Sequence, residues 1–507
     1  MKTLKASRFF VFAMVFFIVA SSLTGCKLNG NIKGENDIKI SIWRSGLGID
    51  FFNQAVADFK RDTGYNVITE DTSDASVMKD SIELGLRYNN VDLYMFGSVT
   101  PSYHKYLEPL NDVLNSNAYG ESVTIESKYN TEVLDALKAS DGNYYHLSYG
   151  GGWAGITYNA DIVDGINYKV PNTTEELDVL VQRLSSNNIT PFIHFESGGY
   201  WFVLNSIWQA QYDGLDYYNN TFLPLNDGTT SPSKNVLKAE DGRKKVIEFF
   251  KKIISPAYIV NGSNGFKFTE AQTRYLDGQA AMMANGTWLL NEMKNSKGRY
   301  SNFLMMKTPV ISEIIDKCPD KSISDDEELS ALITAIDAAG SDKAVIPLSG
   351  SSYSVTQSDL DRVYEARNIM FSNLDDHAFS IPIYASAKEG AKEFIRYFYS
   401  AGAMKKYIET LHMKLPLTID TDINTSTWNG WEKQQMEYND VLTPIFANNP
   451  NKSPVFTLGG ARAYANVNFI TSYSSQSGAM TSEEVWSRMM KVFDDKWESY
   501  LSDAQLA

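Results

Sequence analysis

The order of apolar and polar positions predicts an α/β body that begins near residue 37. Residues 37–43 (DIKISIW) form an apolar, β-branched run that is typical of a buried strand. Phe52, Val56 and Phe59 follow at helical spacing. This helix should end at Gly64, because glycine readily adopts the left-handed conformation of a helix end.

Further strands and helices continue the alternation along the chain. Strands are expected at 66–70, 91–96, 280–285, 303–309 and 380–384, and helices at 77–86, 173–184, 243–254, 391–398 and 482–501. The charged stretch 316–342 should be a solvated loop that leads into a helix. Alternating strands and helices predict open, mainly parallel α/β sheets, and ligands of such sheets bind beyond the carboxyl ends of the strands.

The N-terminus has the pattern of an export signal. A basic start precedes the apolar run 9–20, which is shorter than the roughly 20 residues that span a membrane, and LTGC follows at 23–26. LTGC resembles the lipobox of bacterial lipoproteins. The resemblance implies a signal peptide at 1–25, lipid on Cys26 and a flexible tether at 26–36, so that the protein is held on the outer face of a bacterial cell membrane. The alternative is an ordinary signal peptide with a chance cysteine.

Length and composition restrict the class of protein. A chain of 507 residues is too long for one core and predicts two lobes. Aromatic residues make up 13% of the chain, which is more than packing alone needs. The net charge of -15 argues against a nucleic-acid partner, because phosphates require a basic surface.

The sequence contains no convincing motif for a cofactor or a metal ion. Besides Cys26, the only cysteine is Cys318, so the exported chain has no internal disulfide and Cys318 should be an inert thiol. The five histidines are scattered, which argues against a transition-metal site. Residues 150–155 fit the pattern of a dinucleotide-binding loop, but the chain continues as a strand where that loop needs a helix. We therefore expect no cofactor.

Five stretches carry a family resemblance, and along the chain they occur in the order expected for the family. They are WAGITYNADIV at 153–163, YLDGQAAMMANGTWL at 275–289, IPIYASAKEGAKEFIRYF at 381–398, the segment 92–114 that leads to LEPLND, and a weaker QSGAMTSEEV at 476–485. Together they are similar to the extracellular solute-binding proteins of bacterial ABC sugar importers, the family that includes maltose-binding protein.

The resemblance implies a type II periplasmic-binding-protein-like fold, with a carbohydrate, expected to be an oligosaccharide, bound between two lobes and delivered to an ABC permease. The expected N-terminal lobe is 37–148 with 312–400, and the expected C-terminal lobe is 149–311 with 401–507. The chain should cross between lobes near 148–152, 308–311 and 400–403. Extra residues at 313–378 and 424–460 have no assigned role.

A sugar site needs aromatic planes for the C–H faces of the ring, and carboxylates, amides or Arg for the hydroxyls. The resemblance identifies Trp288 as a stacking ring and points to an aromatic residue within 194–208. We expect nine residues to bind the ligand, some from positions at strand ends and glycine turns, and Tyr200, Trp201, Trp288 and Tyr464 from the resemblance. They are Trp43, Arg44, Asp71, Trp153, Glu196, Tyr200, Trp201, Trp288 and Tyr464, with Arg462 beside the last. Trp208 is expected in the core.

Other functions stay open at this point. A secreted glycoside hydrolase would use a pair of carboxylates, for which Glu196 with Asp213 is a candidate. A structural adhesin would take up no small ligand. An acidic cleft also suits a peptide or a polyamine. Because binding alone needs no acid/base pair, the resemblance favours a binding protein over an enzyme.

Overall fold

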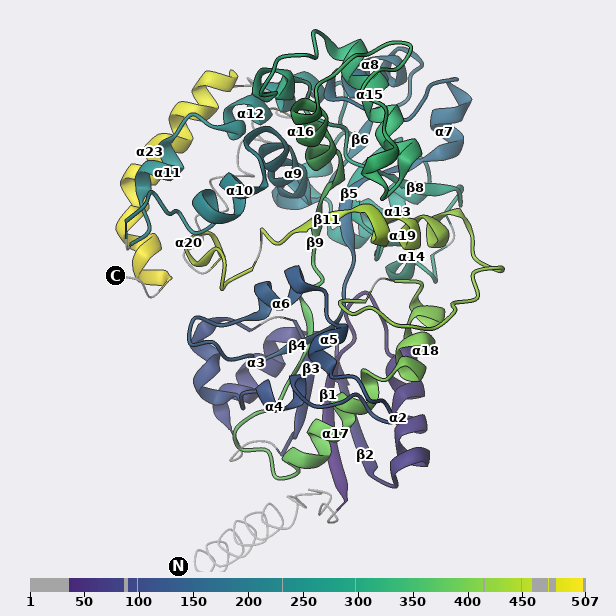
Figure 1. The fold of residues 1–507 in the computed structure, drawn as a ribbon, viewed down its shortest axis with the longest axis vertical. Coiled ribbons are helices and arrows are strands. Elements are labelled where there is room, and N and C mark those ends of the chain that lie inside the picture. The colour runs from purple at the N-terminus through teal and green to yellow at the C-terminus, as the bar shows by residue number, and fades with distance from the viewer. Residues whose placement is uncertain are drawn as a thin grey trace, which may run out of the picture.

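The computed structural model describes residues 36–457, apart from 86–89, 98, 230, 297, 414 and 448, together with 473 and 480–504. Cys26, Arg462, Tyr464 and the signal and tether segments lie outside the described residues. Within the described part, no helix combines the length and apolarity that a membrane span requires. The chain forms two lobes, one above the other in Figure 1.

The first lobe is built on a five-stranded sheet in the order β2-β1-β3-β10-β4. Its strands are β1 (Asp37–Trp43), β2 (Asn66–Thr72), β3 (Leu93–Phe96), β4 (Leu147–Gly150) and β10 (His377–Ser380). Its helices are α2 (Asp50–Thr63), α3 (Ala75–Leu84), η1 (Pro101–Tyr106), α4 (Asn111–Leu114), α5 (Ile125–Lys128), α6 (Thr131–Leu137), α17 (Lys388–Phe398) and α18 (Ala401–Leu411). Parallel pairing joins β1 to β2 and β3, whereas β10 runs antiparallel to both of its neighbours.

The second lobe carries a sheet in the order β11-β9-β5-β7-β6, with β8 also paired to β5. Its strands are β5 (Trp153–Asn159), β6 (Phe192–Ile193), β7 (Met282–Gly286), β8 (Phe303–Met306), β9 (Ile369–Ser372) and β11 (Thr443–Ile445). The central strand β5 is antiparallel to β7, β8 and β9. The two-lobed α/β fold is therefore as predicted, but the sheets are mixed, because β10 in the first sheet and β5 in the second run antiparallel to their neighbours.

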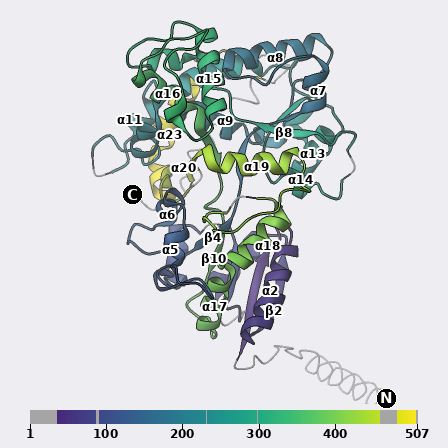
Figure 2. The same cartoon turned by 45° about the vertical axis from the view of Figure 1, so that its right-hand side comes forward.

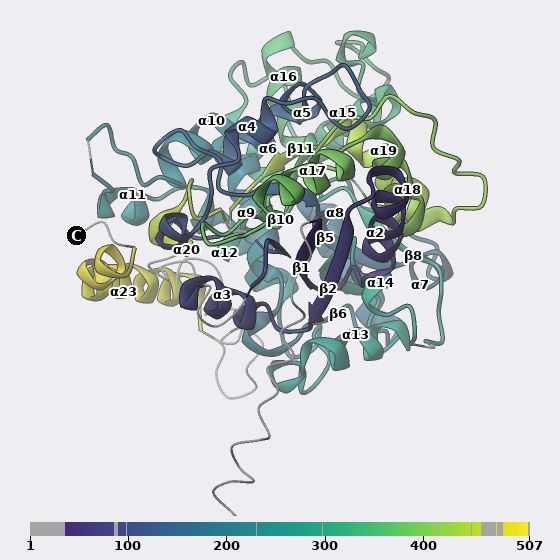
Figure 3. The ribbon, with the colours of Figure 1, turned by 90° about the horizontal axis from the view of Figure 1, so that it is seen from below.

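Helices surround this second sheet. They are α7 (Ala160–Gly165), α8 (Thr174–Ser186), η2 (Glu196–Gly198), α9 (Trp201–Asp213), α10 (Leu215–Tyr217), η3 (Tyr218–Phe222), α11 (Lys234–Lys238), α12 (Gly242–Ile253), η4 (Ser263–Gly265), α13 (Phe268–Leu276), α14 (Leu289–Glu292), η5 (Ser312–Lys317), α15 (Asp326–Ala339), η6 (Lys343–Val345), α16 (Gln357–Asn368), α19 (Gly430–Val441), α20 (Pro454–Thr457) and α23 (Ser482–Asp503). Helix α23 lies on the flank of the lobe beside α11 and packs on α11 and α12 (Figures 1 and 3).

Local sequence explains where several elements begin and end. Gly64 ends α2 with φ 82°, as its position predicted, because an L side chain there would be strained. Helix α15 begins where the Asp325 side chain accepts from the Glu328 amide, and α23 begins with a capping box between Thr481 and Glu484. The predicted strand at 380–384 is wrong: the strand is β10, and Pro382 just beyond it has no N–H for a ladder.

The two apolar cores divide the chain differently from the predicted lobe boundaries. Residues 312–368 were expected in the N-terminal lobe, but α15 and α16 bury Leu332, Ile336 and Val363 in the core of the second lobe. Residues after 401 were expected in the C-terminal lobe, but α18 buries Tyr407 and Ile408 in the core of the first. These helices follow their apolar faces, which a reading of chain order alone does not reveal.

The chain crosses between lobes at 151–152, 373–376 and 412–429. The first crossing is as predicted, whereas the expected crossings at 308–311 and 400–403 lie inside one lobe each, in the second core and between α17 and α18. The first two crossings are bound to each other, because the Gly152 amide donates to Asn373 Oδ1 at 2.7 Å and the Asn373 amide donates to the Gly152 carbonyl at 3.2 Å. Figure 2 brings forward α18 and α19, the helices that the third crossing joins.

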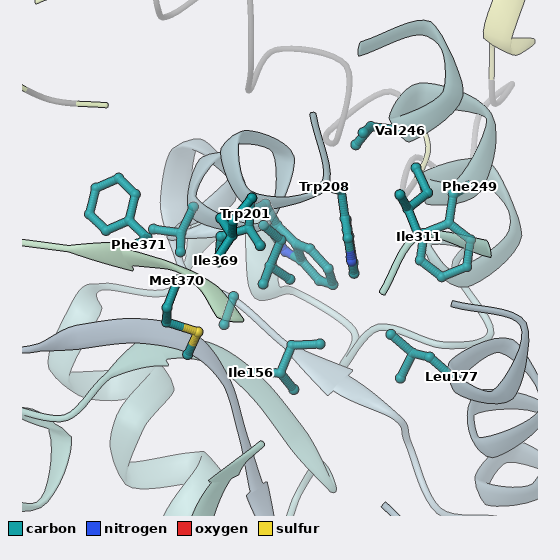
Figure 4. Packing of buried hydrophobic residues seen from close by; sticks show 14 of the residues in the cluster. Ile156, Leu177, Trp201, Trp208, Val246, Phe249, Ile311, Ile369, Met370 and Phe371 are labelled. Atoms are coloured by element: carbon teal, nitrogen blue, oxygen red, sulfur yellow. The ribbon is translucent and has the colours of Figure 1, made fainter. Parts of the chain in front are cut away.

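The second core is rich in tryptophan. Figure 4 shows Trp201 and Trp208 of α9 packed between the sheet, at Ile156 and Ile369, and helix α12 at Phe249. The Trp208 ring meets Phe249 edge to face, with centroids 5.0 Å apart. This packing fixes α9, whose first turn faces the space between the lobes.

Candidate functional site: a cleft between the lobes

A cavity of about 340 Å³ lies between the lobes. The first lobe contributes the loop after β1 and the start of β10, the second lobe contributes α9, α14 and β9, and the second crossing lines the cavity between them. The lining residues are Trp43, Ser45, Gly46, Leu47, Tyr200, Phe202, Val203, Trp288, Glu292, Phe371, Asn373, Asp376, His377 and Met413. We refer to this cavity as the cleft.

The second lobe gives the cleft an aromatic wall, formed by Tyr200, Phe202, Trp288 and Phe371. The rings of Tyr200 and Trp288 meet near edge to face, with centroids 5.6 Å apart and planes at 74°. Phe202 and Phe371 pack in the same manner at 5.7 Å. Such a wall offers ring planes on which an apolar sugar face can lie.

Glycines position two of these rings. Before α9, Gly198 and Gly199 take φ of 81° and 59°, and this tight turn brings Tyr200 to the cleft. The Trp288 indole lies directly over Gly286 at the end of β7, where an added Cβ would be 2.2 Å from the ring. Glycine at position 286 is therefore required for the position of Trp288.

The wall that the first lobe contributes to the cleft contains both aromatic and polar side chains. Trp43 ends β1, its ring centroid is 5.4 Å from that of His377, and its indole N–H donates to the Ser73 carbonyl at 3.4 Å. Across the cleft, Gly46 approaches Glu292 so closely that an added Cβ would lie 2.5 Å from the Glu292 Cγ. The two lobes thus touch at this point through a glycine and an acid.

Polar groups come mainly from the second crossing and from α14. Asp376 lies beside Gly97, with its Oδ1 2.8 Å from where a Cβ would stand. Gln272 donates to Glu292 Oε2 at 2.7 Å. His377 is 6% exposed, and its Nδ1 has no hydrogen-bond partner in the described part of the chain.

Burial shifts the pKa values of these groups. Burial raises the pKa of Glu292 to about 7, although the hydrogen bond from Gln272 opposes the shift. Burial also raises the pKa of Tyr200, and the charges of Glu292 and Asp376 raise it further. Burial lowers the pKa of His377, against the opposite effect of Asp376, so the imidazole is neutral at neutral pH. All three shifts have burial as their largest cause, so the polar groups of the cleft are withdrawn from solvent.

Three of the predicted site residues meet in the cleft: Trp43, Tyr200 and Trp288. Three other predicted site residues form ion pairs outside the cleft. Arg44 and Asp71 form an ion pair with each other, and Glu196 pairs with Lys267 at 2.6 Å. None of these three lines the cleft. Tyr464 lies outside the described residues.

Two predicted ligand-binding tryptophans are core residues instead. Trp153 is 1% exposed and donates to Asn439 Oδ1 at 3.1 Å, and Trp201 is fully buried and donates to His194 Nδ1 at 3.2 Å. A glycine turn precedes both residues, which suggested exposure, but β5 and α9 turn these rings inward. Trp208 is in the core as predicted, where its N–H donates to the Pro309 carbonyl at 2.9 Å.

Sequence reasoning missed several lining residues, notably Phe202, Glu292, Phe371, Asn373, Asp376 and His377. Phe202 and Glu292 had a usable signal, because each stands within four residues of a predicted ring, Tyr200 or Trp288. The crossing at 373–376 had none, since NLDD reads as an ordinary turn.

The family of the chain follows from comparison with known proteins. Residues 54–422 match the family model described as bacterial extracellular solute-binding protein, and the chain belongs to this family. Family members of this kind bind solutes outside the cell and work with ABC transporters. No curated protein sequence matches the chain.

Solved structures of sugar receptors share the fold. The bacterial solute receptor AcbH has a TM-score of 0.63 at 16% identity, over 92% of this chain and 99% of its own. RafE in complex with raffinose has a TM-score of 0.55 at 14% identity, over 90% and 99%. The maltotriose-binding protein of Thermus thermophilus has a TM-score of 0.54 at 14% identity, over 91% and 100%.

The carboxylate pair considered for a hydrolase is not assembled. Glu196 precedes α9 and Asp213 ends it, so the 13 residues of this helix separate them by about 20 Å at the usual rise. Glycosidase carboxyl groups stand roughly 5–9.5 Å apart. Asp213 instead accepts from the Gly242 amide at 3.0 Å, at the start of α12.

Proposed function

We propose that this protein is an extracellular receptor that binds a carbohydrate in the cleft and delivers it to an ABC permease. The single observation that carries the proposal is the convergence of Trp43, Tyr200 and Trp288, from both lobes, on one cavity that also holds carboxyl, amide and imidazole groups. Ring planes for C–H faces and polar groups for hydroxyls are what a sugar requires. Closure of the lobes around the ligand would bring the two walls together.

The size of the cleft favours a short sugar. Its volume of about 340 Å³ is at the lower end of the roughly 300–1,000 Å³ of small-molecule sites. A mono- or disaccharide suits this volume better than the longer oligosaccharide that the family resemblance suggested. The ligands of the structural neighbours, β-D-galactopyranose for AcbH and raffinose for RafE, support a sugar as the class of ligand.

A ligand screen tests the proposal. Purified residues 27–507 are heated with mono-, di- and oligosaccharides, with a peptide and polyamine panel as the comparison. A ligand at a hundred times its Kd stabilises the folded state by about 2.7 kcal/mol, and we expect this shift from a short sugar. Stabilisation by peptides or polyamines alone, or by nothing, contradicts the proposal, and so does sustained release of sugar from any glycan.

We propose also that lipid on Cys26 holds the receptor at the membrane. The support is the LTGC sequence that follows the apolar run 9–20. Replacement Cys26→Ala should move the protein from the membrane fraction of cells to the medium, because the remaining chain keeps no acyl chain. Retention of the variant in the membrane fraction would contradict the anchor and leave the sugar proposal intact.

A further inference from the structure

The charges of the cleft are of one sign. The lining residues include two carboxylic acids, Glu292 and Asp376, and no Lys or Arg. Two basic residues that stand next to lining segments form ion pairs with acids outside the lining: Arg44 with Asp71, and Lys294 with Asp50 at 3.3 Å. Among the described residues that line the cleft, a ligand therefore meets two carboxylic acids and no Lys or Arg.

Of the two acids in the cleft, Glu292 gives the stronger argument for a cationic ligand. It is held by the Gln272 amide on one side and covered by Gly46 of the other lobe, and in the described part of the chain no Lys or Arg lies within ion-pair distance of it. A carboxylate withdrawn from water is costly unless a cation pairs with it. Burial accordingly raises the pKa of Glu292 to about 7, so that near neutral pH the group is poised to lose its proton when a cation arrives.

Asp376 brings the second charge to the same place. The charges of Glu292 and Asp376 both raise the pKa of the Tyr200 phenol, so both acids lie near this ring of the aromatic wall. On its other side Asp376 adjoins Gly97, and a Cβ there would stand 2.8 Å from Asp376 and 3.9 Å from the Trp43 ring. An ammonium group close to carboxylates and aromatic rings is stabilised by charge pairing and by cation–π attraction.

His377 is an independent sign that a ligand completes this site. It is more than nine-tenths buried, it lines the cleft, and its Nδ1 lacks a hydrogen-bond partner in the described part of the chain. A buried polar atom without a partner is costly, and a ligand hydroxyl or amine would supply the missing bond. Since the imidazole is neutral, it adds no positive charge that would attract an acid.

We propose that the cleft selects sugars by charge: a sugar with a protonated amine binds more tightly than its neutral counterpart, and a sugar acid binds most weakly. This inference rests on the proposed function, because it concerns which carbohydrates the same cleft accepts. Glu292 and Asp376 are the specificity-determining residues, and each would pair with the ammonium of the ligand.

Calorimetric titration of the purified chain at pH 7 tests the order. Matched ligands are glucose, glucosamine and glucuronate, the same three forms of galactose, and a glucosamine disaccharide with its N-acetylated form. We expect the amine to bind at least tenfold more tightly than its neutral partner, and the uronate at least tenfold more weakly. The inference is overturned if a uronate binds as tightly as the neutral sugar, an outcome that leaves the proposed function standing.

Two variants remove the charges and keep the shapes. Glu292→Gln and Asp376→Asn should each reduce the amine-to-neutral affinity ratio at least fivefold, and both affinities are measured for each variant so that the ratio is independent of any loss shared by the two sugars. Glu196→Gln is the control, because this exposed acid of the same lobe pairs with Lys267 and does not line the cleft. An unchanged ratio in both cleft variants, with melting temperatures near that of the parent, overturns the inference.

A simple diamine tests whether the cleft binds an ammonium group without a sugar. If a diamine binds and no sugar does, the proposed function falls, and the preference among sugars falls with it. If neither a diamine nor any sugar binds, both are overturned.

Discussion

The aromatic wall of the cleft and the tryptophan core behind it use the same kinds of side chain for different ends. Tyr200 and Trp201 are neighbours in sequence, yet Tyr200 lines the cleft while Trp201 is fully buried, with its ring 5.0 Å from Phe192 and 5.5 Å from Phe250. Tyr200 is the N-cap of α9 and Trp201 is the first residue of the helix. The direction of the side chain from the helix, and not its residue type, decides whether a ring stabilises the fold or meets a ligand.

The sharpest test of the core side of this comparison is Trp208→Ala. The variant removes a fully buried ring and the hydrogen bond to the Pro309 carbonyl, so it should lower the free energy of unfolding by about 3–5 kcal/mol. Urea unfolding measures the loss, and titration of the folded variant should give the affinity of the parent. A large loss of affinity with unchanged stability would show that Trp208 contributes to ligand binding and not to the core.

The matching test of the wall is Trp288→Ala. Trp288 is partly buried and lines the cleft, so its removal should weaken sugar binding about a hundredfold, or about 2.7 kcal/mol, with a smaller effect on unfolding than Trp208→Ala. Gly286→Ala is the companion variant, because its methyl group would displace the indole without removing it. Weakened binding in both variants supports a stacking role, whereas unfolding of Trp288→Ala would show that the ring belongs to the core.

The comparison also shows how far the sequence predicts the site. Trp43 and Trp288 were found because a strand end and a family motif mark their places. Arg44 and Asp71 were expected in the cleft from the same strand-end rule, but β1 and β2 are parallel neighbours, with Ile42 opposite Asp71, so the two charges neutralise each other. A single sequence reveals the end of a strand and not which side chains pair there.

The fold shows the same division between local and long-range information. Strand β1 was predicted at its observed bounds, because the pattern of its own seven residues is enough to identify a strand. The crossings at 373–376 and 412–429 were missed, since they depend on which core each helix joins. Asn373, Asp376 and His377 line the cleft because the chain crosses between the lobes there, and the local sequence does not predict this crossing.

Stability should also depend on pH through the second crossing. Burial raises the pKa of Asp375 from 3.8 to about 7, against a hydrogen bond from Asn449 at 2.7 Å. A carboxyl group with a raised folded pKa favours folding most below its unfolded pKa, and this contribution is lost as the pH rises from about 4 to about 7. Asp375→Asn should therefore raise the free energy of unfolding at pH 8 by about 2 kcal/mol relative to the parent, with a much smaller difference at pH 4.

Unfolding in urea at pH 4 and pH 8 measures this effect. Asp376→Asn is the useful neighbour for comparison, because Asp376 lies in the cleft and Asp375 is 6% exposed in the crossing. An equal pH dependence in the parent and Asp375→Asn would contradict the assignment.

The smallest predicted effect tests whether the two walls of the cleft must meet. Gly46→Ala adds a methyl group that would stand 2.5 Å from Glu292 of the other lobe, so the lobes could close less fully and ligand affinity should fall about tenfold, or about 1.4 kcal/mol. Gly402→Ala is the control, because no atom outside its own helix lies near an added Cβ there. X-ray scattering with saturating sugar should show a larger radius of gyration for Gly46→Ala than for the parent or the control. If Gly46→Ala closes and binds like the parent, the wall of the first lobe contributes without contact to the second, and the aromatic wall alone would determine affinity.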